Sequence, residues 1–175
     1  TIRRRLLDYN AFGDDNNGRM LGANVGYEPH GDLRGLSVGV HAFGSTVDTR
    51  AASGALLART RLRMAGGYFG YEANAWEGLG EYYRFANRDM ASGTRHGSSA
   101  WFAQLGRSYG SLTPYIRHER ASLDPADNYF ATQHIGRSYT RWSIGTRFDF
   151  EAKSALKVEF GATTESGANL VDDNG

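Results

Sequence analysis

The chain has 175 residues, among them 23 Gly, 10 Tyr and no Cys, and its formal net charge at pH 7 is +1. This near-neutral charge argues against a nucleic-acid-binding surface, which needs an excess of clustered basic residues. No stretch approaches the about 20 apolar residues of a transmembrane helix. Gly and Tyr at these levels favour long β-strands over a helical bundle, and the length suits a single domain over residues 1–175.

Alternation of apolar and polar residues predicts a series of strands along the chain. They are expected at about 2–12, 20–27, 36–43, 61–71, 76–85, 100–109, 113–121, 139–150 and 154–164. The expected connections alternate between short turns, at about 29–32, 73–75, 110–112 and 151–153, and long loops, at 45–59, 86–98 and 122–138. Such alternation is typical of transmembrane barrels, which have short turns on one side of the membrane and longer loops on the other.

The period-two pattern is clearest in the segment 142–150, where Ile144 and Phe148 lie on one side and Arg147 and Asp149 on the other. A soluble sandwich would bury the apolar row, whereas a transmembrane barrel turns it toward lipid. Strands of about ten residues match a tilted crossing of the bilayer and exceed the usual length in globular sheets. The sequence therefore predicts an all-β, antiparallel, up-and-down transmembrane β-barrel with about eight strands in this chain, and a soluble β-domain is the alternative.

Four short segments resemble elements of porin-like outer-membrane barrels of Gram-negative bacteria. They are YNAFG at 9–13, WEGLGEYYRF at 76–85, LTPYIRHER at 112–120 and ALKVEF at 155–160. Members of that family close with a strand that ends in an aromatic residue, and their barrels are about twice this length. This chain instead ends in the loop-like sequence DDNG. The resemblance implies a portion of a larger barrel, and a complete eight-stranded barrel is the alternative.

If the apolar rows face lipid, the opposite rows line the lumen, because an Arg or Lys on the lipid side would cost about 2–4 kcal/mol at the mid-plane. The predicted pore-lining residues are His41, Glu81, Gln104, Arg117, Glu119, Arg141, Arg147, Asp149, Lys157 and Glu159, with Asn24 and Glu77 on the same rows. Arg supplies nearly all of the 20 basic side chains, and its fixed fork suits a wall laced with carboxylates. Such a wall either attracts anionic solutes or forms an internal salt-bridge lattice that fills a narrow barrel.

No metal or catalytic site is predicted. The five His residues share no metal-ligand spacing, and Cys partners are absent. Ser37 and His41 share a face but lie about 13 Å apart along one strand, too far for a proton relay. No cofactor is expected.

The predicted function is passive diffusion of small hydrophilic solutes across a bacterial outer membrane, with a weak preference for anions and without catalysis. Its expected partners are outer-membrane lipid and lipopolysaccharide, with no nucleic acid, and a homo-oligomer is left open. Two alternatives remain: a non-conducting structural or adhesive barrel, and a lipid hydrolase with its site at the barrel rim.

Overall fold

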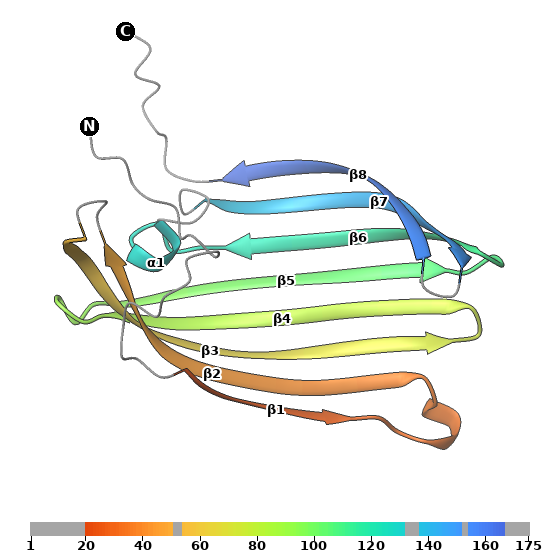
Figure 1. Cartoon of the computed structure of the whole chain (residues 1–175), viewed down its shortest axis with the longest axis horizontal. Helices are drawn as coiled ribbons and strands as arrows, with labels where there is room; N and C mark the ends of the chain where they lie inside the picture. The colour runs from red at the N-terminus through yellow and green to blue at the C-terminus, as the bar shows by residue number, and fades with distance from the viewer. Residues whose placement is uncertain (1–19, 51–53, 132–136, 152–153, 167–175) are drawn as a thin grey trace, which may run out of the picture.

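The computed structural model describes residues 20–50, 54–131, 137–151 and 154–166. Within these ranges the chain forms one antiparallel sheet of eight strands, whose order in space is their order in the sequence (Figure 1). The strands are β1 (Leu21–Tyr27), β2 (Leu36–Arg50), β3 (Leu56–Ala73), β4 (Trp76–Asp89), β5 (Arg95–Arg107), β6 (Leu112–Ser122), β7 (Ser138–Glu151) and β8 (Ser154–Ser166). Two short helices accompany them, η1 (Gly31–Leu33) and α1 (Asn128–Ala131).

The two ends of the sheet differ in their connections. At the turn end, β3 and β4 are joined through Asn74 and Ala75, whose positive φ angles of 53° and 66° form a two-residue hairpin turn. The β1–β2 and β5–β6 connections lie at this same end (Figure 1). The opposite end, the loop end, carries the β2–β3 and β4–β5 connections and α1 (Figure 1). The described strands therefore run antiparallel between the turn end and the loop end.

The pairing register divides the side chains between two faces. One face, here called the apolar face, carries an apolar row on every strand, and many of its side chains are exposed: Val25 is 68% exposed, Ile144 61% and Phe160 72%. The other face, the polar face, carries His41, Arg117 and the residues that alternate with the apolar rows. The apolar rows comprise Leu21, Val25, Tyr27, Val38, Val40, Phe69, Tyr71, Trp76, Tyr82, Leu105, Leu112, Ile116, Trp142, Ile144, Phe148, Phe150, Leu156, Val158 and Phe160.

The sheet curves around its polar face. Arg147 on β7 reaches over β6 and β5 to bond to Glu77 on β4, at 3.0 Å. Neighbouring strands lie about 4.8 Å apart, so a flat sheet would hold these strands some three spacings apart. In addition α1, which belongs to the β6–β7 connection, contacts β2 and β3. Both contacts make the polar face the concave one.

Little of the apolar surface is buried by the fold itself. The buried hydrophobic residues of the described chain are Leu62, Met64, Tyr115, Ala121 and Phe130. They lie on the polar face of β3 and β6 and on α1. The hydrophobic core is therefore small, and most large apolar side chains lie outside it.

Two sequence-based expectations about loops are wrong. The segment 45–59 is mostly strand, because β2 continues to Arg50 and β3 begins at Leu56. The segment 86–98 is likewise mostly strand, because β4 continues to Asp89 and β5 begins at Arg95. Of the loop expected at 122–138, the described residues between β6 and β7 confirm the connection at 123–131, with α1 inside it, while 132–136 lie outside the described residues. The strand expected at 2–12 lies outside the described residues.

Candidate functional site

The polar face holds all ten residues that the sequence predicts for the lumen. In the pairing of neighbouring strands from β2 to β8, each lies opposite another of the ten or opposite a different residue of the polar face. Seven of them, all on β6, β7 and β8, enter ion pairs with one another or with Glu77. The polar face of these three strands is the candidate site.

The larger group of ion pairs joins β6, β7 and β8, and is called the charge network. Nη2 of Arg117 donates a hydrogen bond of 3.0 Å to Glu119 on the same strand. Arg141 on β7 bridges two strands, with Nε 3.6 Å from Glu119 and Nη2 3.5 Å from Glu159 on β8. Nζ of Lys157 lies 3.4 Å from Glu159. Three cationic side chains thus share two carboxylates, which leaves the network with an excess of positive charge.

The side chain of Tyr115 also contacts two members of the charge network. The Tyr115 hydroxyl donates to Oε2 of Glu159 at 2.7 Å, and Nζ of Lys157 lies 4.7 Å from the centre of the Tyr115 ring. The ring lies directly over Gly145 on β7, where any Cβ would collide with it. Gly145 is therefore needed for this ring to lie flat on the sheet and to reach Glu159.

A second ionic group lies nearer the turn end. Arg147 donates through Nη2 to Glu77 at 3.0 Å and through Nε to Asp149 at 3.0 Å. The Ser108 hydroxyl also donates to Glu77, at 3.4 Å. Glu77 and Arg147 line an open hollow of about 590 Å³ at this end of the polar face. One cation here faces two carboxylates, so the local excess is negative and opposes that of the charge network.

The remaining predicted residues do not join these groups. The His41 ring stacks on Tyr68 at 6.2 Å and lies 5.5 Å from Tyr83, and Glu81 bonds to the Tyr83 hydroxyl. Gln104 lies on β5, on the same face. Within the described part of the chain none of the three hydrogen-bonds to the charge network. They form the more neutral half of the polar face.

The connection between β6 and β7 folds onto the polar face at the loop end, and residues 123–131 are called the docked loop. Nδ2 of Asn87 on β4 donates to Oδ2 of Asp127 at 2.7 Å, and both side chains are only 1% exposed. Phe130 of α1 packs edge-on against Phe85, with ring centres 5.1 Å apart. The loop thus covers part of the concave face.

A second set of contacts ties the docked loop to β5. Nδ1 of His96 lies 2.9 Å from a carboxylate oxygen of Asp124, whose backbone N–H donates to Ser98 Oγ at 2.9 Å. The hydrogen bond with His96 holds the pKa of Asp124 below its ordinary value, although burial of the carboxyl acts in the opposite direction. The ionised carboxylate therefore helps to hold the loop, and this contribution is lost as the pH falls through the lowered pKa.

The described residues show no arrangement suited to metal binding or to nucleophilic catalysis by Ser37. No group of three His, Asp or Glu side chains among them could hold a metal ion. The Ser37 hydroxyl donates to the Gly70 carbonyl at 3.4 Å, while His41 stacks on Tyr68. No helix in the described chain is long and apolar enough to cross a membrane.

Comparison of the chain with models of known protein families, with curated proteins and with solved structures finds no match. The arrangement of side chains on the two faces is therefore the basis for a functional proposal.

Several important site residues are not found by sequence reasoning. Tyr115 alternates with Thr113 and Arg117, and this parity could have placed it on the polar row. Asp127 carries no such signal, because it lies in an irregular loop, 40 positions away from its partner Asn87. Packing of a loop against a sheet depends on the curvature of the folded sheet, which a local sequence pattern does not predict.

Proposed function

We propose that this sheet forms the wall of a channel in a bacterial outer membrane, through which small hydrophilic solutes diffuse passively with a weak preference for anions. In this proposal the apolar face contacts lipid and the polar face lines the aqueous path. The observation that carries it is the inverted distribution of side chains: large apolar residues are exposed on all eight strands, while the ion pairs that join β4, β6, β7 and β8 lie on the concave face.

The exposed apolar surface supports a lipid environment. Each Å² of apolar surface kept in water forgoes about 25 cal/mol of burial free energy, and soluble monomers rarely expose contiguous patches beyond a few hundred Å². The apolar row of β7 runs from Trp142 to Phe150, which agrees with the about 9–11 residues of a tilted membrane-crossing strand. Contact with lipid tails would remove this cost on every strand.

Aromatic residues at both borders of the apolar face also support this orientation. Near the turn end, the Arg107 guanidinium lies 5.1 Å from the Trp76 ring centre. Toward the loop end, the His118 ring stacks on Trp142 at 4.1 Å and meets Trp101 edge-on at 4.9 Å. Rings with a polar atom collect where lipid headgroups meet the acyl chains. The two groups are the expected borders of the lipid-facing band.

The proposal requires closure of the wall. Among the described strands β1 pairs only with β2, and β8 only with β7, so each has one free edge. In lipid every backbone N–H and C=O needs a partner, which only a closed sheet provides. Closure therefore requires β1 and β8 to pair with each other, with further strands of a larger barrel, or with another copy of the chain.

A non-conducting structural barrel is the second candidate, and the ion pairing favours it. Each of Arg117, Arg141, Arg147 and Lys157 has a carboxylate within 3.6 Å, and the docked loop covers part of the same face. Single-channel recording in planar bilayers separates the two candidates. Discrete conductance steps from the folded protein support the channel, whereas inserted protein without steps supports the structural barrel.

Selectivity tests the role of the polar face. Replacing Arg141 and Arg147 together by Gln removes two cations and frees Glu77 and Glu159 from these partners. The cation-to-anion permeability ratio is expected to rise on the order of twofold, because a charge in water contributes about 1 kcal/mol at 4 Å and less after screening. The measurement is the reversal potential under a salt gradient.

The matched control removes two arginines from the apolar face, Arg107→Gln with Arg120→Gln, and should leave the reversal potential unchanged. A shift of equal size in this control would mean that overall charge, and not the polar face, sets selectivity. No shift in the Arg141 and Arg147 double variant, in channels that conduct, would place these arginines outside the ion path.

A further inference from the structure

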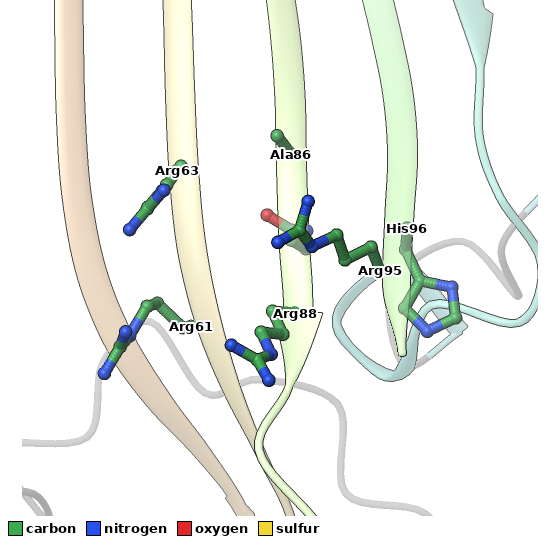
Figure 2. Close-up of a pocket in the computed structure, with 7 residues that line it drawn as sticks. Arg61, Arg63, Ala86, Arg88, Arg95 and His96 are labelled. Atoms are coloured by element: carbon green, nitrogen blue, oxygen red, sulfur yellow. The ribbon is translucent and has the colours of Figure 1, made fainter. Parts of the chain in front are cut away.

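Four arginines gather on the apolar face at the loop end, where the apolar rows stop. Figure 2 shows them on the neighbouring strands β3, β4 and β5. They line one hollow of about 200 Å³. All four side chains are exposed, and they lie closer to the loop end than the apolar rows of their own strands. This basic patch consists of Arg61, Arg63, Arg88 and Arg95.

The register places like charges directly opposite one another. Arg61 on β3 pairs with Arg88 on β4, and Arg88 pairs with Arg95 on β5. Side chains at directly opposed positions have Cβ atoms only about 5 Å apart, and like charges there destabilise the sheet. A row of three arginines across three strands is therefore unfavourable unless an anion lies among them.

The protein does not supply that anion within the described residues. None of the four guanidinium groups has an ion pair or a side-chain hydrogen bond there, and nearby carboxylates are engaged elsewhere. Asp48 is bound by Arg59 at 2.7 Å, and Asp89 accepts hydrogen bonds from the backbone N–H groups of Ala91 and Ser92. Among the described residues, the patch is thus a preformed cluster of bidentate donors without a protein acceptor.

We infer that the basic patch binds the phosphate group of an anionic lipid, whose acyl chains lie along the adjoining apolar face. Arginine forks match phosphate oxygens two at a time. The exposed apolar residues Phe69 and Tyr82, on two of the same strands, favour an amphipathic ligand over a free anion or a nucleic acid. This inference rests on the membrane setting of the proposed function. It adds which headgroup is bound, a phosphate, and which side chains bind it.

The test uses vesicles of phosphatidylcholine that contain phosphatidic acid, whose headgroup is a terminal phosphate, or phosphatidylserine, whose headgroup ends in a carboxylate and an amine. Acyl chains of the minor lipid are brominated, and quenching of tryptophan fluorescence reports its enrichment around the protein; Trp101 lies on β5, the strand of Arg95. Insertion is first established from the heat-dependent shift in gel mobility. Wild-type protein is expected to enrich phosphatidic acid over phosphatidylserine.

The variant Arg88→Gln with Arg95→Gln should lower that enrichment about tenfold, the loss of one strong charge-assisted contact. Arg88→Lys with Arg95→Lys keeps the positive charge but should lose part of the enrichment, because lysine lacks the bidentate fork of arginine. The control, Arg34→Gln with Arg107→Gln, removes the same charge at the turn end and should change enrichment less than about twofold.

Each other outcome counts against the inference in a distinguishable way. Inserted wild-type protein with no preference for phosphatidic acid overturns it and leaves the channel proposal standing. Equal enrichment of both anionic lipids would show attraction by charge alone. Abolition of the enrichment by millimolar inorganic phosphate would show a site for free phosphate. Failure of the wild-type chain to insert into any vesicle would overturn both proposals together.

Discussion

In lipid vesicles the Val25→Arg variant is expected to lose about 2–4 kcal/mol of folding free energy, the cost of an arginine facing the middle of a bilayer. Val25 lies on the apolar face of β1, opposite Val40, and is 68% exposed. An exposed site in water accepts arginine at little cost, so a loss of this size would identify the solvent as lipid. Urea titration of the folded fraction in vesicles, followed by the heat-dependent shift in gel mobility, measures the effect.

The matched variant is Asn24→Arg, at the adjacent residue on the polar face. Asn24 is also exposed, and among the described residues its side chain accepts one hydrogen bond of 3.2 Å, from the Tyr68 hydroxyl. Its replacement should cost about 1 kcal/mol or less, the value of one exposed hydrogen bond. Equal and small losses in the two variants would contradict the lipid-facing orientation.

Release of the docked loop is the second large effect expected. Asn87→Ala removes the partner of Asp127 and leaves a carboxylate that is 1% exposed without its 2.7 Å hydrogen bond. Truncation of one member of a buried, charged hydrogen bond costs about 2–5 kcal/mol, which is more than a short surface loop can absorb. The loop should leave the polar face, and chymotrypsin should then cleave after Phe130, which is buried in the wild-type chain.

The control for this experiment is Asn24→Ala on β1. It removes an amide from the polar face at a position that makes no hydrogen bond to the docked loop. Its cleavage rate after Phe130 should match that of the wild type. If the channel conducts, loop release should also raise its conductance. Rapid cleavage of the wild-type chain would mean that the loop is not held on the face at all.

The strands could be predicted from the sequence as far as their apolar rows extend. On β7 the alternation of Trp142, Ile144 and Phe148 with charged residues gives the strand and assigns its faces. On β3 the same alternation predicts residues 61–71 but not the end of the strand at the loop end, although the backbone pairing with β2 persists to Leu56.

The missing strand ends have one physical cause. In the strand ends that the sequence does not predict, charged side chains such as Asp48, Arg59, Arg88 and Arg95 occupy apolar-face positions in place of large apolar ones. The alternation of apolar and polar residues is then lost although the backbone hydrogen bonds continue, so these segments resemble loops in sequence.

The candidate site could be predicted in part. Parity alone places the ten predicted residues on one face, because the register shifts on β2 and β7 lie beyond these residues, at Thr49/Arg50 and Asp149/Glu151. It does not reveal that Arg147 reaches Glu77 across two intervening strands, since that contact depends on the curvature of the sheet. It also gives no indication of the bond between Asn87 and Asp127.

Water accessibility along a single strand tests the central claim most directly. The chain has no Cys, so single cysteines can be placed one at a time along β8 and labelled in proteoliposomes with a charged maleimide that does not cross lipid. Positions 157, 161 and 163 lie on the polar face, and 156, 158 and 160 on the apolar face. The channel proposal predicts rapid labelling at the first three positions and protection at the other three. Rapid labelling at Leu156, Val158 and Phe160, which are all exposed in the isolated chain, would contradict it.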